Sequence, residues 1–262
     1  MFTILLHSSK TMRQADESTN DIQQPALGSA AQELATYLKG LSHEQIQSCM
    51  KLSEQKSQAT YDLIQKWGTT NAPQLPAIDA FLGDIYSGLQ VQSFTEHNRA
   101  YANESLYILS GLYGVLQALD SVYPYRLEMG YRLPDEPYKN LYSFWGNRIA
   151  EQLPKDRTII NLSAIEYTKA VFPYLDSSQK IISPRFLTID PKSGEPKFVV
   201  VHAKIARGAF AHWLITHAIE SENTLHNFNE LNYHFSDELS TADEPVFICV
   251  TFGGLGLSVR LS

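Results

Sequence analysis

Hydrophobic and polar positions follow two different periods along this chain, and each period predicts a different kind of element. Helical spacing of apolar residues covers residues 34–67 and 203–220. Short apolar runs of strand length lie at residues 2–6, 158–162, 180–183, 197–201 and 246–251. Because strands and helices are interleaved, we expect an α+β fold with a compact mixed sheet and flanking helices. We find no linker or repeat, so residues 1–262 are expected to form one domain, with residues 249–262 as an atypical tail.

The longest weakly charged stretch runs from Leu106 to Gly130. Its leucines at positions 109, 112, 116 and 119 recur every three or four residues, which predicts a helix that begins near Ser110 and follows a shorter helical pattern. Gly111 and Gly114 would form the turn of this helix hairpin. Beyond the proline at position 124 the backbone is expected to be extended, because proline disfavours a helix in the residue before it.

In that extended segment, Arg126 and Glu128 would lie on one side and Leu127 and Met129 on the other. The two charges could simply neutralise each other. Alternatively, Glu128 could hold the Arg126 guanidinium in position for a ligand. The residues alone leave both interpretations open.

Lys204 and Arg207 form a second group of charges, three residues apart at the start of the predicted helix 203–220. Residues at this spacing lie on the same side of a helix, where two cations repel each other. A bound phosphate or carboxylate near the helix N-terminus would relieve that repulsion. A solvated helix face would explain the same spacing, so this choice is also open.

The sequence predicts a capping box at two helix starts. In this motif a serine and the residue three positions later satisfy each other's backbone donors. One joins Ser42 and Gln45, and the other joins Ser163 and Glu166. In the second case Lys169 would lie one turn further along the helix, on an exposed or cleft-facing side.

Composition and motifs exclude several classes of protein. The net charge of −7 confines any nucleic-acid surface to a local patch. Two distant cysteines, Cys49 and Cys249, predict neither a disulfide framework nor a cysteine-rich metal site. The phosphate loop, zinc-protease helix and serine nucleophile elbow are absent, so no metal or cofactor is expected. Residues 2–6 lack the length and flanks of a signal peptide, and we expect a soluble cytoplasmic protein without a membrane span.

Several strings of residues occur in the order found in one known family. They are ILSGLYG at 108–114, PYRLEMG at 124–130, AKIARG at 203–208, AFLGDIYSGL at 80–89, LYSFWG at 141–146 and NLSAIEYTKAV at 161–171. With these strings the chain resembles the YaaA family of bacterial peroxide-stress proteins over nearly its whole length.

The resemblance implies a role in the oxidative stress response and binding of duplex DNA without strong sequence preference, through a positively charged cleft and a helix-hairpin-helix-like element. That element would span residues 106–122, where the glycine turn would present backbone N–H groups to phosphates. Tyr107 and Gln117 stand where many relatives carry arginine. The candidate residues for binding DNA or another anion are Lys10, Gly111, Gly114, Arg126, Glu128, Lys169, Lys204 and Arg207.

Two other functions fit the same residues. Arg, Glu and Lys within apolar strings could form the pocket of an enzyme that acts on a small anionic or nucleotide-like substrate, because low-dielectric surroundings strengthen their hold on charge. A protein-interaction module, in which the strings only maintain the fold, is the third possibility.

Overall fold

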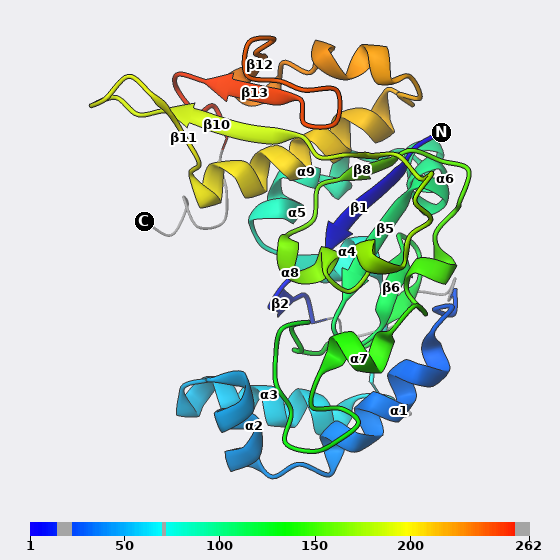
Figure 1. The fold of residues 1–262 in the computed structure, drawn as a ribbon. Helices are drawn as coiled ribbons and strands as arrows, with labels where there is room; N and C mark the ends of the chain where they lie inside the picture. Colours follow the sequence, from blue (N-terminus) through cyan, green and yellow to red (C-terminus); the bar gives the residue numbers. More distant parts are fainter. Residues whose placement is uncertain (15–22, 70–71, 255–262) are drawn as a thin grey trace.

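A mixed five-stranded sheet lies at the centre of the computed structural model, which describes residues 1–14, 23–69 and 72–254 (Figure 1). Its strand order is β6-β5-β1-β8-β9. The four parallel strands are β5 (Leu106–Ser110), β1 (Thr3–His7), β8 (Ile159–Asn161) and β9 (Ile181–Ile182). Strand β6 (Gly114–Gln117) pairs antiparallel with β5 at one edge. The carboxyl ends of the parallel strands therefore meet at one edge of the sheet.

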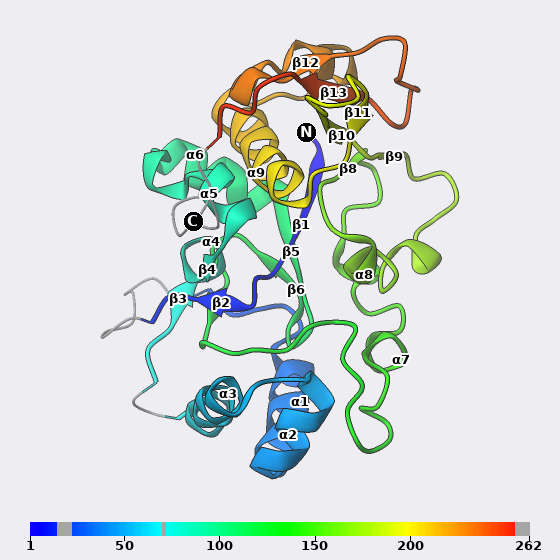
Figure 2. The ribbon, with the colours of Figure 1, turned by 90° about the vertical axis from the view of Figure 1, so that its left-hand side faces the viewer.

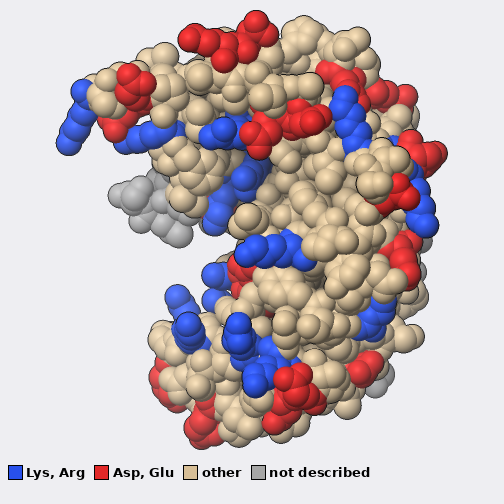
Figure 3. All heavy atoms as spheres, viewed as in Figure 1, with Lys and Arg blue, Asp and Glu red and all other residues tan. Residues whose placement is uncertain are grey.

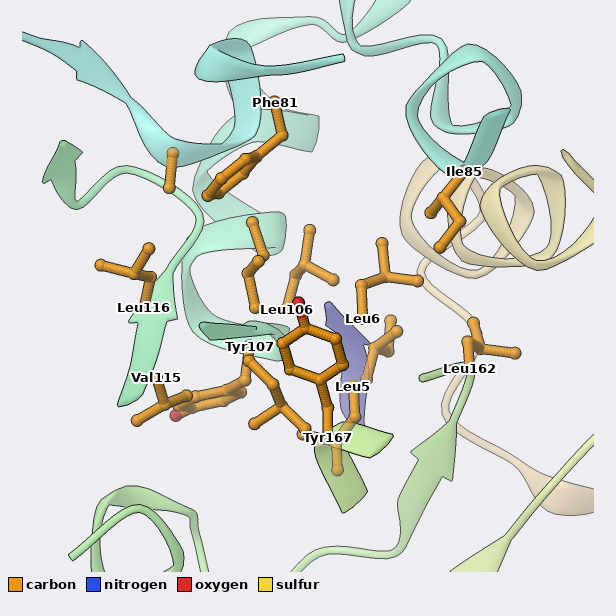
Figure 4. Close-up of a cluster of buried hydrophobic side chains, with 14 of the residues drawn as sticks. Leu5, Leu6, Phe81, Ile85, Leu106, Tyr107, Val115, Leu116, Leu162 and Tyr167 are labelled. Carbon is orange, nitrogen blue, oxygen red and sulfur yellow. The ribbon is translucent and has the colours of Figure 1, made fainter. Parts of the chain in front are cut away.

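Every residue of β1 is buried, which is typical of a parallel strand covered on both faces. Leu5 and Leu6 of this strand lie among side chains from distant segments, including Leu106 and Leu162 of the sheet region and Phe81 (Figure 4). The apolar run at residues 2–6 thus predicted this strand correctly.

A second, four-stranded sheet has the order β11-β10-β13-β12. Its strands are β10 (Arg185–Ile189), β11 (Pro196–Lys197), β12 (His234–Phe235) and β13 (Val246–Cys249). Helix α9 (Val200–Thr216) lies under this sheet and packs on its other side against α5 (Asp84–Leu89) (Figure 1). Phe186 of β10 stacks on Phe247 of β13 within the sheet, and its edge-on contact with Phe210 joins the sheet to α9.

Three helices lie at the opposite end of the molecule from the second sheet, with the central strands between them (Figure 2). They are α1 (Gly28–Lys39), α2 (His43–Met50) and α3 (Glu54–Lys66). The capping box predicted at Ser42 is confirmed, because the serine hydroxyl accepts from the Gln45 N–H while the Gln45 side chain accepts from the Ser42 N–H.

Short elements connect these layers. The helices are α4 (Ala77–Ala80), α6 (Glu96–Ser105), α7 (Leu141–Trp145) and α8 (Ile165–Thr168), and the strands are β2 (Thr11–Met12), β3 (Leu75–Pro76), β4 (Phe81–Leu82) and β7 (Ser121–Val122). Single turns of 3₁₀ helix lie at Val91–Ser93, Ala150–Gln152, Phe172–Tyr174 and Glu230–Asn232, and a longer one at Glu222–Asn227.

The helix hairpin predicted at residues 106–122 is wrong. This segment forms the antiparallel pair β5 and β6, in which Ile108 pairs with Leu116 and Leu109 with Val115. A short, fully buried apolar run fits a strand as well as a helix, and here the sheet determines the outcome. No helix-hairpin-helix element occurs in the described part of the chain.

Gly111 and Gly114 are buried, so their backbone donors do not face solvent as a phosphate-binding turn requires. A Cβ on Gly111 would lie 2.4 Å from the Leu127 carbonyl oxygen, and Gly114 has a φ of +71°. These glycines allow close packing of the chain rather than contact with a ligand.

Two further expectations concern the last third of the chain. The strand expected at residues 197–201 is wrong beyond Lys197, because α9 begins at Val200. The expected atypical tail begins at Cys249, the last residue of β13, and residues 255–262 lie outside the described residues. Among the described helices, none has the length and hydrophobicity needed to cross a membrane.

Candidate functional site

A pocket of about 350 Å³ opens where β1 ends. We call it the His7 pocket. It is lined by His7, Ser8, Ser9, Lys10, Leu82, Gly83, Asp84, Ile85, Tyr86, Glu128, Ala164, Glu166, Tyr167 and Lys204. These residues come from the end of β1 and from segments near α5, α8 and α9, which are far apart in sequence. Ligands of open α/β sheets bind outside the carboxyl ends of the strands, which is the position of this pocket.

His7 is 8% exposed and its ring stacks on Tyr167, with the ring centres 4.9 Å apart. Its Nδ1 accepts a hydrogen bond of 3.2 Å from the Ala164 N–H, so the neutral ring carries its proton on Nε2. Burial, together with the nearby charges of Arg207 and Lys204, lowers the pKa of His7 to about 3. The ring is therefore a neutral hydrogen-bond donor at physiological pH.

Glu128 lies beside His7's stacking partner. Its Oε1 accepts from the Tyr167 hydroxyl at 3.2 Å, and its Oε2 lies 3.5 Å from Lys10 Nζ. Burial raises the pKa of Glu128, Lys10 opposes that rise, and the neighbouring charge of Glu166 adds to it. The pocket thus holds a carboxyl group whose proton affinity exceeds that of an exposed glutamate.

Glu166 does not form the capping box expected at the start of α8. Ala164 is the N-cap residue of that helix, and Ser163 Oγ instead lies 3.3 Å from His7 Nδ1. Glu166 Oε1 accepts from the Gly130 N–H at 2.8 Å. The side chain therefore joins α8 to the segment that carries Glu128 and is one of three carboxylates that line the pocket, with Asp84 and Glu128.

Two more hollows adjoin the His7 pocket. One of about 350 Å³ shares Lys10, Glu128 and Glu166 with it, and one of about 620 Å³ shares Leu82, Gly83 and Tyr86. We call the three hollows together the trough. Its cations are Lys10, Arg13, Lys51, Arg132 and Lys204. Figure 3 shows this hollowed face, with Lys and Arg side chains on both sides of it.

The structure brings three of the predicted site residues, Lys10, Glu128 and Lys204, together in the His7 pocket. Arg207 is half-buried and lies close enough to lower the pKa of His7, although it does not line the pocket. Lys169 is exposed at the end of α8 and lies outside the lining.

Arg126 occupies a different place from Glu128. The alternation expected in this segment is present, since Leu127 and Met129 are buried while both charged residues are half-buried. Arg126 borders a small hollow of about 10 Å³ beside Trp67 and Leu112, and its Nε is buried without a hydrogen-bond partner among the described residues. Glu128 pairs with Lys10 and not with Arg126, so the neutralising pair considered from the sequence does not form.

Sequence reasoning missed His7 and Tyr167. The available signal for His7 was its position directly after the apolar run at residues 2–6, where a parallel strand ends. Tyr167 carried no such signal, because only packing against His7 and Glu128 identifies it. No group of three or more His, Cys, Asp or Glu side chains that could hold a metal ion occurs within residues 1–14, 23–69 and 72–254.

Comparison with known proteins agrees with the family resemblance found in the sequence. The family model described as peroxide stress protein YaaA matches residues 2–239. A UPF0246 protein of Salinispora tropica is 52% identical over 257 residues, which cover 98% of this chain and 97% of the relative. A UPF0246 protein of Marinomonas sp. (strain MWYL1) is 40% identical over 230 residues, which cover 86% of this chain and 87% of that relative. The chain therefore belongs to the YaaA family of peroxide stress proteins.

Proposed function

We propose that this protein acts in the peroxide stress response by binding duplex DNA along the trough, without strong sequence preference. The observation that supports the proposal is the position of the cations. Five of them line one hollowed face of a chain whose net charge is −7 (Figure 3). Phosphate contacts of this kind fix the position of a duplex but carry no sequence information.

The pairing of the trough's charges favours an external anion. Of its carboxylates, Asp79 forms an ion pair with Arg99, and Glu128 forms one with Lys10. Lys51, Arg132 and Lys204 have no carboxylate partner within 4.0 Å in the described parts of the chain. Cations without a partner on a concave surface attract phosphates at low ionic strength.

Contact with DNA would rely on the cationic side chains of the trough, since the glycines at positions 111 and 114 are buried. Each neutralised phosphate contributes about −0.9 to the slope of log affinity against log salt. Removing two such cations should therefore make the slope shallower by about 2.

The test is the binding of a random-sequence duplex, measured by fluorescence anisotropy across a salt series. The variant that combines Lys51→Gln with Arg132→Gln should bind more weakly at low salt and show the shallower slope. Lys155→Gln is the matched control, because this exposed lysine precedes β8 and lies toward the opposite edge of the sheet from the His7 pocket. Negligible affinity of the natural protein at low salt, or equal slopes for both variants, would overturn the proposal.

A further inference from the structure

The His7 pocket has features that binding of a DNA backbone does not explain. Its volume of about 350 Å³ falls within the range of small-molecule sites, which is roughly 300–1,000 Å³. It also presents groups of both signs, with Lys10 and Lys204 as its cations and Asp84, Glu128 and Glu166 as its carboxylates. A surface that only holds phosphates has no use for these three carboxylates, since they repel phosphate.

Lys204 in the pocket lining and Arg207 outside it lack carboxylate partners among the described residues. Neither Lys204 nor Arg207 has a carboxylate within 4.0 Å in the part of the chain that the structure describes. Both lie close enough to His7 to lower its pKa. The His7 Nδ1 is occupied by the Ala164 N–H, which leaves the Nε2–H as a neutral donor in the same pocket as Lys204. This combination of donors is suited to a phosphate group.

The carboxylate side of the pocket has unused acceptor capacity. Glu166 uses only Oε1 within the described residues, for the Gly130 N–H. Glu128 accepts one hydrogen bond from Tyr167 and faces Lys10 across 3.5 Å, so lone pairs on both of its oxygens are left. Carboxylate oxygens with spare lone pairs accept hydrogen bonds from hydroxyl groups.

We propose that the His7 pocket binds a small phosphorylated sugar, in which one molecule carries both a phosphomonoester and free hydroxyl groups. The phosphate lies against Lys204 and the His7 Nε2–H. The sugar hydroxyls donate to Glu128 and Glu166. The His7 pocket is one of the three hollows of the trough, but binding of a sugar phosphate in it does not depend on DNA binding.

The first experiment measures binding of ribose 5-phosphate, inorganic phosphate and ribose by isothermal titration calorimetry. The natural protein should bind ribose 5-phosphate more tightly than either fragment. Lys204→Met should weaken binding of ribose 5-phosphate about tenfold or more, because it removes a charge-assisted hydrogen bond. Lys169→Met is the matched control, since this exposed lysine lies outside the pocket lining, and its affinity should equal that of the natural protein.

A second variant tests the carboxylate side of the pocket. Glu166→Gln keeps an amide oxygen that can accept from the Gly130 N–H but removes the negative charge. Binding of inorganic phosphate should therefore strengthen, while the preference for ribose 5-phosphate over phosphate should fall severalfold. Circular dichroism and thermal melting of each variant establish that it is folded before its affinity is compared.

The proposal is overturned if the natural protein binds none of these probes at millimolar concentration, or if Lys204→Met and Lys169→Met bind ribose 5-phosphate equally well. It is also overturned if inorganic phosphate alone binds as tightly as ribose 5-phosphate. Duplex binding is titrated separately in the same buffer. If the natural protein binds ribose 5-phosphate but no duplex, only the DNA proposal is contradicted. If it binds duplex but no ribose 5-phosphate, only the sugar-phosphate proposal is contradicted.

Discussion

Lys10 and Glu128 form an ion pair beside the His7 pocket, with Lys10 Nζ 3.5 Å from Glu128 Oε2. The two side chains differ in burial, since that of Glu128 is 13% exposed and that of Lys10 is 56% exposed. The lysine therefore reaches in from solvent and offsets only part of the cost of removing the carboxylate from water. The net result is the raised pKa of Glu128.

This raised pKa predicts how Glu128 affects stability. The folded protein binds the Glu128 proton more tightly than the unfolded chain does, so the contribution of this residue is most favourable at low pH and is lost as the pH rises through the pKa. Glu128→Gln stays uncharged and should be at least as stable as the natural protein at pH 8. Urea unfolding at pH 4 and pH 8 measures this. A variant that loses more stability at pH 8 than at pH 4 would contradict it.

His7 should have the opposite dependence on pH. Its pKa of about 3 in the folded protein lies below the ordinary value of 6.5, so the unfolded chain binds the proton first as the pH falls. Stability from His7 is therefore complete above pH 6.5 and is lost below it. Between pH 7.5 and pH 5 the contribution of His7 should fall by about 2 kcal/mol, measured by urea unfolding as the difference between the natural protein and a variant without this histidine.

The variant His7→Asn isolates this effect. Asp120, whose pKa burial raises to about 6, changes stability in the opposite direction over the same range. Because Asp120 is present in both proteins, its contribution cancels in the comparison. The natural protein should lose more stability than His7→Asn on going from pH 7.5 to pH 5, and identical losses would show that His7 is not held in its neutral form.

Gly208 of α9 and Gly88 of α5 allow these two helices to approach very closely. A Cβ on Gly208 would lie 1.8 Å from the Ile85 carbonyl oxygen, and one on Gly88 would lie 2.0 Å from that of Ile205. Gly208→Ala must push the helices apart and should lower the free energy of unfolding by about 3 kcal/mol. Gly28→Ala is the control, since a Cβ there meets nothing within 4 Å, and chemical denaturation should show little change. Equal stability of the two variants would contradict the observed packing.

The two serines at the starts of α2 and α3 provide a matched pair. Ser42 accepts from the Gln45 N–H, whereas Ser53 occupies the same position in α3 without a side-chain capping bond. Ser42→Ala should cost about 1 kcal/mol in urea unfolding because a helix donor loses its partner. Ser53→Ala should cost clearly less. A larger loss for Ser53→Ala would refute the assignment of the cap.

Local features of the fold were predictable from the sequence because they depend on neighbouring residues. The strand ending at His7 followed from the short run at residues 2–6, which is apolar except for Thr3, and the cap at Ser42 followed from a serine and glutamine at the required spacing. The exposure pattern of Arg126 and Glu128 followed from the alternation of an extended chain.

The segment from Leu106 to Gln117 could not be assigned in this way. Its leucine spacing satisfies a helix, but every residue from 106 to 116 is buried, and burial on all sides removes the amphipathic signal that separates the two structures. The pairing of β5 with β1 decides the matter, because backbone donors buried in the core need hydrogen-bond partners.

The amino-acid sequence by itself determined the family, the strand and helix signals with a clear period, and three members of the pocket: Lys10, Glu128 and Lys204. Only the tertiary structure decided that Glu128 pairs with Lys10, that Arg126 lies elsewhere, and that His7 and Tyr167 belong to the site. The physical reason is that the spacing of apolar residues and the capping of helices depend on residues that are close in sequence. Ion pairs, burial and pKa values depend on which distant segments the folded chain brings together.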